Sequence, residues 1–311
     1  MKSKILFIFL ILLSGILISC ANDKENNDYT FIDSLGNEIT LNEKPKKVAC
    51  LFSSYAQIWQ LSGGDVFVTV KESIDRGFCN DDVILVDDAS GHFSIDMEVL
   101  IESDVDFVIG TTDYNCQVEA CRMMNSIGIP SALFKVESFD DYLKVLKICT
   151  DITGDDNSYI INGLNIQKEI DEIKNKVLNK EEKIEILFLR AGSSSKSTKA
   201  KNSNDNFACR MLKELNTINI ADDAVELVDN LSLEYITIKN PDYIFISPMG
   251  IEELSKAYIN ELFKKDGWKD LDAVKNNRYI FLSKDLFHYK PNNRWAESYK
   301  VMYDILYENK Y

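Results

Sequence analysis

The segment 155–183 constrains the fold of this chain more than any other part of the sequence. Its apolar residues recur every three or four positions, which places them on one stripe of an α-helix. They are Ile166, Ile170, Ile173 and Val177. A helix of about 27 residues spans roughly 40 Å, about the diameter of a domain. Because β/α-patterned sequence flanks it on both sides, we expect one stiff helix to connect two lobes. An ordinary surface helix inside one domain is the alternative.

The N-terminus reads as an export signal. Lys2 and Lys4 precede an apolar run over 5–18, which is short for a membrane span but suits a signal sequence. The run ends in Ser19-Cys20, which resembles a bacterial lipobox. We therefore expect a signal peptide over 1–19, a lipid such as palmitate on Cys20, and a polar tether over 20–28. A secretory signal in which Cys20 has no role is the alternative.

Composition limits the classes of function. The net charge of −15 makes the chain a poor partner for nucleic-acid phosphates. The two histidines, His92 and His288, argue against a histidine-rich transition-metal site, and we expect no metal site built by the protein. Six cysteines follow Cys20, and their spacing fits no small disulfide scaffold, so their redox state stays open.

Short apolar runs alternate with amphipathic segments on both sides of the long helix. The expected parallel strands before it are 48–52, 67–70, 83–86, 107–109 and 132–134. Those after it are 184–189, 218–220, 243–246 and 278–282. A Gly36-Asn37 turn predicts a hairpin over 29–41 in front of them. The fold class is therefore α/β, with two Rossmann-like lobes over 29–154 and 184–311, each built on a central parallel sheet.

One pattern occurs in both lobes at the same spacing. Glu98 begins a predicted helix eight residues before Asp106, which precedes the strand 107–109. Glu234 stands eight residues before Asp242, which precedes the strand 243–246. An acid in the first turn of a helix is common, because it complements the helix dipole. The identical spacing nevertheless indicates a structural repeat between the lobes.

These features resemble the substrate-binding lipoproteins of ABC importers for iron–siderophores, haem and cobalamin, over essentially the whole mature chain. The family's motif of glutamate, apolar run and proline-aspartate is complete in the second lobe, at Asn240-Pro241-Asp242. The first copy departs from it, since Val105 stands where proline is usual. Trp268-Lys-Asp-Leu271 and the segment 273–279 are similar to the family's C-terminal signature.

The resemblance implies two lobes joined by one backbone helix, with the ligand in a cleft between them and little closure on binding. It implies a non-enzymatic, monomeric binding lipoprotein on the outer face of the cytoplasmic membrane, without a resident cofactor. Its partners would be an ABC permease and the ATPase of that permease. Glu98 and Glu234 would dock onto the permease.

Ligands of open parallel sheets bind at the carboxyl ends of the strands. The candidate ligand-binding residues that follow strands are Ser54, Tyr55, Thr111, Asp113, Tyr114, Arg190, Lys199, His288, Tyr289 and Arg294. The cationic, hydroxyl-rich segment 190–203 could hold carboxylates, catecholates or phosphates, or be a solvated loop. His288 and Tyr289 could ligate haem iron. Trp295 could line the cleft or pack in the core.

A ferric siderophore is the first expected ligand, haem the second and cobalamin the third. An enzyme with nitrogenase-like or chelatase-like lobes is the main alternative from another class, although the sequence carries no P-loop, GxSxG or HExxH motif. An adhesin or signalling lipoprotein would explain the lipobox but not the paired glutamates.

Overall fold

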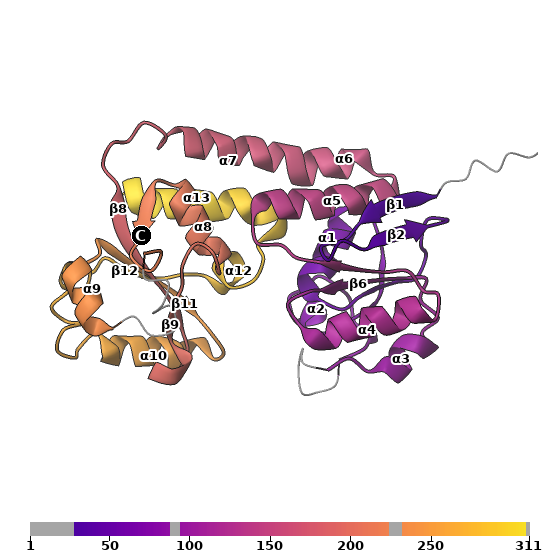
Figure 1. Ribbon diagram of the computed structural model, residues 1–311, viewed down its shortest axis with the longest axis horizontal. Coiled ribbons are helices and arrows are strands. Elements are labelled where there is room, and N and C mark those ends of the chain that lie inside the picture. The colour runs from indigo at the N-terminus through magenta and orange to yellow at the C-terminus, as the bar shows by residue number, and fades with distance from the viewer. Residues whose placement is uncertain (1–27, 88–93, 224–231, 309–311) are drawn as a thin grey trace, which may run out of the picture.

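The computed structural model describes residues 28–87, 94–223 and 232–308. The expected signal peptide, Cys20, the tether up to residue 27 and His92 lie outside these ranges. The described residues form two α/β lobes that lie side by side, with helices crossing between them along one edge (Figure 1). The α/β class with two parallel sheets is therefore confirmed. No helix within the described ranges has the length and apolar character needed to cross a bilayer.

The first lobe begins with the expected antiparallel hairpin, β1 (Tyr29–Ile32) and β2 (Glu38–Leu41). Its main sheet is parallel, in the order β5-β4-β3-β6-β7. The strands are β3 (Val48–Cys50), β4 (Val66–Thr69), β5 (Ile84–Leu85), β6 (Phe107–Thr111) and β7 (Ser131–Phe134). The helices are α1 (Ser53–Leu61), α2 (Lys71–Asp75), α3 (Met97–Glu102), α4 (Asn115–Ser126) and α5 (Phe139–Thr153). Every residue of β3, β6 and β7 is buried, as in a parallel sheet covered on both faces.

The second lobe repeats this arrangement with the strand order β10-β8-β11-β12. Its strands are β8 (Ile184–Ala191), β9 (Lys199–Ala200), β10 (Thr217–Asn219), β11 (Tyr243–Pro248) and β12 (Tyr279–Phe281). Its helices are α8 (Phe207–Glu214), α9 (Leu233–Lys239), α10 (Glu252–Leu262), α11 (Asp272–Lys275), α12 (Lys284–Phe287) and α13 (Trp295–Tyr307). Two 3-10 turns, η2 (Ser195–Ser197) and η3 (Asn292–Arg294), complete it.

The repeat extends to individual hydrogen bonds. Asp106 exchanges backbone and side-chain bonds with Lys47, the residue before β3. Asp242 makes the same exchange with Glu185 in β8. Two residues before each aspartate, Asp104 and Asn240 have φ values of 52° and 44°, in the left-handed region that Asp and Asn tolerate best. The spacing seen in the sequence therefore reflects two equivalent helix–turn–strand units.

The connection between the lobes is helical but is not one uniform α-helix. It consists of α6 (Asp156–Tyr159), the π-helical turn η1 (Ile160–Leu164) and α7 (Asn165–Asn175). The predicted stripe is correct, since Ile166, Ile170 and Ile173 are buried. The expected end at 183 is wrong, because the last α-helical residue is Asn175. We call residues 156–175 the strut.

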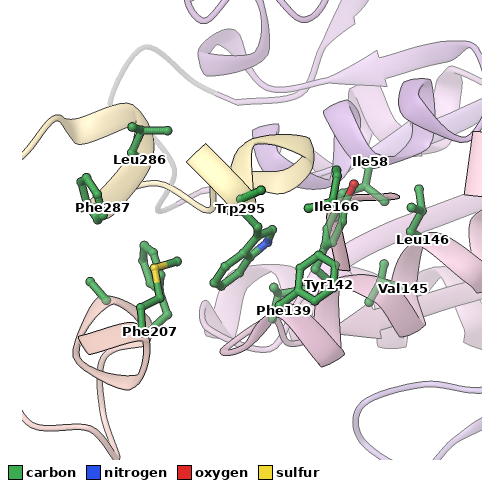
Figure 2. Close-up of a cluster of buried hydrophobic side chains, with 14 of the residues drawn as sticks. Ile58, Phe139, Tyr142, Val145, Leu146, Ile166, Phe207, Leu286, Phe287 and Trp295 are labelled. Atoms are coloured by element: carbon green, nitrogen blue, oxygen red, sulfur yellow. The ribbon is translucent and has the colours of Figure 1, made fainter. Parts of the chain in front are cut away.

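One hydrophobic core runs from lobe to lobe beneath the strut. Trp295, at the start of α13, is 1% exposed and lies between Phe139 of the first lobe and Phe207 of the second (Figure 2). Its ring centroid is 6.2 Å from that of Phe139 and 5.7 Å from that of Phe207. Of the two roles left open for Trp295, the structure supports core packing. Each lobe also has an outer core of its own.

Successive side chains of β8 point to opposite faces of its sheet, so this strand contributes residues to two hydrophobic cores. Ile186 and Phe188 join the core that crosses between the lobes. Leu187 and Leu189 point to the opposite face and join the outer core of the second lobe. Trp268 packs against Phe263 in that outer core, with ring centroids 5.6 Å apart, and takes no part in the junction between the lobes.

Candidate functional site

Polar side chains collect where the carboxyl ends of the two parallel sheets face each other. In the first lobe, β3 ends directly before α1, which opens with Ser53 and Ser54. Arg76, just after α2, donates to the hydroxyl oxygens of Ser53 and Ser54 at 3.1 and 3.3 Å. Ser53 also hydrogen bonds to the carboxylate of Glu72. Glu72 and Arg76 were not among the predicted residues, although α2 follows β4 as α1 follows β3.

The matching position of the second lobe carries two cations. Arg190 lies near the end of β8 and is exposed. The expectation of a simple loop over 190–203 is wrong at this point, because β9 pairs antiparallel with β8 and sets Lys199 directly opposite Arg190. Directly opposed like charges repel one another, so this pair favours a bound anion. The hairpin also fixes the backbone of both residues.

The segment 288–292 brings the second lobe against the first. The ring of Tyr289 stacks under the Arg76 guanidinium at 4.3 Å. Asn292 is fully buried and donates to the Ser54 carbonyl oxygen at 2.9 Å and to the Gln57 side chain at 2.7 Å. Its φ of 49° lies in the left-handed region. These contacts join the lobes at the site itself.

A second set of interlobe contacts meets at Glu137, between β7 and α5. Its carboxylate lies 3.6 Å from the Lys290 ammonium and 3.8 Å from the Arg210 guanidinium. Arg210 also donates to the Glu137 carbonyl oxygen at 3.3 Å. One carboxylate of the first lobe therefore holds two cations of the second.

Charges of both signs act on the site, and Glu72 opposes the cations Arg190, Lys284 and Arg76 in their effect on the pKa of His288. Burial, followed by the nearby charges of Arg190 and Lys284, lowers the pKa of His288 from 6.5 to about 4. Near pH 7 the imidazole is therefore neutral. Burial raises the pKa of Tyr114, and Arg190 acts in the opposite direction, which places Arg190 of the second lobe within electrostatic reach of Tyr114 of the first.

The structure separates the predicted ligand-binding residues into two groups. Ser54, Tyr114, Arg190, His288 and Tyr289 gather around the interface between the lobes, with Lys199 opposite Arg190. Ser54 is 1% exposed, so it takes part through its contact with Arg76. We call these six residues, together with Ser53, Glu72 and Arg76, the interlobe cluster.

The other predicted residues serve different roles or lie at the edge. Tyr55 is 2% exposed and Thr111 is fully buried, so their side chains support the site from within the first lobe. Asp113 is exposed, and its backbone N–H donates to the Thr111 hydroxyl at 3.2 Å. Arg294, the last residue of η3, is exposed and forms a two-point ion pair with Glu297 of α13, at 2.7 and 2.8 Å. Its guanidinium is therefore engaged within the chain.

Glu98 and Glu234 lie outside this site, on α3 and α9. Each is exposed and is the second residue of its helix. The helix N-caps are also equivalent, since Asp96 and Ser232 both accept backbone N–H groups of the first turn. In Figure 1 the two helices lie at the outer parts of the two lobes.

Five of the six cysteines after Cys20 are buried free thiols within the part of the chain that the structure describes: Cys50, Cys79, Cys121, Cys149 and Cys209. The sixth, Cys116, is partly exposed. Burial raises the pKa of each thiol and so disfavours the reactive thiolate. Within the described ranges, no group of three or more His, Cys, Asp or Glu side chains is arranged to hold a metal ion.

Comparison with known proteins gives one family. A family model described as periplasmic binding protein matches residues 48–286. An uncharacterised ABC transporter substrate-binding lipoprotein of Bacillus subtilis (strain 168), YvrC, is 24% identical over 296 residues, which cover 89% of this chain and 88% of that protein.

Solved structures share the fold. The periplasmic heme-binding protein RhuT from Roseiflexus sp. RS-1, in apo form, has a TM-score of 0.69 at 16% identity and covers 85% of this chain and 98% of its own. The periplasmic catecholate-siderophore binding protein VctP from Vibrio cholerae has a TM-score of 0.71 at 15% identity. It covers 89% of this chain and 99% of its own.

Proposed function

The chain belongs to the periplasmic binding protein family, and on that premise we propose that it is the substrate-binding lipoprotein of an ABC importer. It captures its ligand outside the cytoplasmic membrane and delivers it to the permease, and it catalyses no reaction. Three observations support this function: the similarity to a substrate-binding lipoprotein over 89% of the chain, the site between two equivalent lobes, and the equivalent placement of Glu98 and Glu234.

The ligand we propose is a ferric siderophore with a net negative charge. The observation that carries this choice is the cationic face at the carboxyl end of β8. There Arg190 is exposed and stands directly opposite Lys199. A guanidinium binds carboxylate or catecholate oxygens in two-point fashion. The partly exposed rings of Tyr114 and Tyr289 would cover an apolar part of the ligand.

Haem is the second candidate, on one specific observation. A histidine ligates iron in its neutral form, and the lowered pKa keeps His288 neutral near pH 7. Tyr289 is the weaker candidate ligand, because burial raises the pKa of its phenol. In both cases the iron arrives as part of the cargo.

Titrations with defined ligands test this proposal. The full mature chain is titrated with ferric catecholate, ferric hydroxamate and ferric carboxylate siderophores, haemin and cyanocobalamin, while tryptophan emission and visible absorbance are recorded. We expect an anionic ferric siderophore to bind. Replacing Arg190 by Gln removes a charge-assisted bond worth about 1.5–3 kcal/mol, so affinity should fall roughly 10- to 150-fold.

The matched control is Lys168→Gln, which removes the same charge from an exposed position on α7. It should bind as tightly as the wild type. Equal affinity of the Arg190→Gln and wild-type proteins would refute the ligand site. Tight binding of haemin alone, lost in His288→Ala, would favour the second candidate.

Lipidation at Cys20 and docking through Glu98 and Glu234 are further parts of the proposal. Exposed charges at the rim of an interface steer and orient association more than they add affinity. The double variant Glu98→Lys/Glu234→Lys should therefore lose uptake in cells while binding ligand normally. Glu102→Lys/Glu253→Lys, which reverses two exposed charges on α3 and α10, is the control and should leave uptake intact. Normal uptake by the first variant would reject these two residues as docking sites.

A further inference from the structure

The outer side of the strut exposes aliphatic side chains at one place. Ile160, Ile161 and Leu164 of the π-helical turn η1 are 47%, 52% and 41% exposed. We call these three residues the η1 apolar patch. The nearest exposed charges on the strut are of both signs: Asp156 lies four residues before the patch, and Lys168 and Glu169 lie four and five residues after it. A strongly charged partner therefore gains little here.

The π-helical turn presents these side chains because its inner residues are fixed to the first lobe. Asn162 donates to the Leu61 carbonyl oxygen at 2.9 Å and accepts from the Tyr142 hydroxyl at 2.8 Å. Gly163 lies so close to Leu143 that a Cβ atom would approach it to 2.7 Å. Because Asn162 and Gly163 are held against the first lobe, the other three residues of η1 face outward. The patch is therefore a fixed feature of the surface rather than a frayed end.

The patch lies beside the point where the chain enters the fold. The hydroxyl of Tyr29, the first residue of β1, donates to Asp151 on α5 at 3.1 Å. Asp151 pairs with Lys147, whose ammonium lies 5.6 Å from the centre of the Tyr159 ring. Tyr159 directly precedes Ile160. Figure 1 shows the start of β1 at the same end of the molecule as α6.

We propose that the η1 apolar patch rests on the lipid bilayer when the protein is anchored but not engaged with the permease. This inference rests on the proposed lipid at Cys20. The nine residues 20–28 span at most roughly 30 Å. The tether thus holds this end of the molecule close to the bilayer, and such confinement makes a weak contact effective. A few aliphatic side chains enter the headgroup–acyl boundary without any need for lipid charge.

The consequence concerns orientation. In Figure 1, α3, which carries Glu98, lies on the side of the molecule away from the strut. With the patch on the bilayer, this docking helix points away from the membrane. Delivery to the permease then includes a rotation of the anchored protein, and the resting contact keeps unengaged molecules out of the docking orientation.

Tryptophan quenching by brominated lipids tests the proposal. The full chain is expressed with its residues 1–19, purified from membranes and placed in phosphatidylcholine vesicles brominated near the headgroup. Ile161→Trp is compared with Ile127→Trp, a matched control at the end of α4 with 53% exposure. Of the three native tryptophans, Trp59 and Trp295 are buried and Trp268 is partly exposed, and the unsubstituted protein in the same vesicles measures their combined emission. After subtraction of the native tryptophan emission, we expect the emission of the tryptophan introduced by Ile161→Trp to fall about twofold, because patch side chains reach about 5–10 Å into the interface.

Vesicle flotation of the unsubstituted protein separates the two proposals. If it fails to float, the lipid anchor is wrong and the resting contact falls with it. If it floats but Ile161→Trp is quenched no more than Ile127→Trp, the anchor stands and the resting contact is overturned. A blue shift without lipid quenching, together with dimers in analytical ultracentrifugation, also overturns it, because a second copy of the chain then covers the patch.

Discussion

Removing the indole of Trp295 should show that the two lobes are held by one core. The side chain is 1% exposed and lies between rings of both lobes. Deleting a buried aromatic side chain costs about 3–5 kcal/mol. Among the described residues the buried Trp295 Nε1 has no hydrogen-bond partner, so its loss returns about 1 kcal/mol. We therefore expect Trp295→Ala to lower the free energy of unfolding by about 2–4 kcal/mol.

Urea unfolding followed by circular dichroism measures this change. Trp295→Phe keeps a ring against Phe139 and Phe207 and removes the unpartnered N–H, so it should stay within about 1.5 kcal/mol of the wild type. Trp268→Ala, in the outer core of the second lobe, is the positional control: it should lower stability without separating the lobes. The wild type should unfold in one transition. Two wild-type transitions, or an unchanged midpoint in Trp295→Ala, would refute the shared core.

The remaining predictions concern the strut, the repeat and pH. Ile170→Pro breaks α7 and should cost about 3 kcal/mol or more, with a larger loss of uptake than of secondary structure. Asp106→Ala removes the carboxylate that accepts from the N–H groups of residues 46 and 47, and it should cost about 0.5–1.5 kcal/mol in urea unfolding because these bonds are exposed and water can replace the carboxylate. Asp242→Ala, whose bond to the Glu185 N–H is partly buried, should cost at least as much. Because His288 has a lower pKa folded than unfolded, the unfolded chain binds more protons between about pH 4 and 6.5. The melting temperature of the wild type should therefore fall as the pH drops through that window. The melting temperature of His288→Gln should fall less over the same window.

Most of the fold could be predicted from the sequence because it follows from local patterns of apolar and polar residues. The burial of Ile166, Ile170 and Ile173 follows from helical periodicity, and the spacing of Glu98 and Glu234 from their aspartates located two equivalent units. The end of the strut at Asn175 could not be predicted, because the helical spacing of apolar residues continues to Val177 and the sequence after Asn175 has no Gly or Pro to end the helix. Periodicity alone also does not distinguish the π-helical turn from α-helix.

The candidate site could be predicted only in part from the sequence, because it depends on contacts between residues that are distant in the chain. The rule that ligands lie after strand ends selected Arg190 and Tyr289 as candidates, and the same rule applied to β4 would also have selected Arg76, which lies against Tyr289. Whether a side chain after a strand points outward is set by packing, which buries Thr111. Arg294 pairs with Glu297, three residues later in the chain. These outcomes depend on neighbours that are distant in sequence or on side-chain conformation.

Equilibrium binding of an anionic ferric siderophore tests the central claim most directly. The account predicts one ligand per chain, recovered chemically unchanged after prolonged incubation, with affinity lost in Arg190→Gln and kept in Lys168→Gln. Chemical conversion of the ligand, or failure of every siderophore, haemin and cyanocobalamin to bind, would contradict the account.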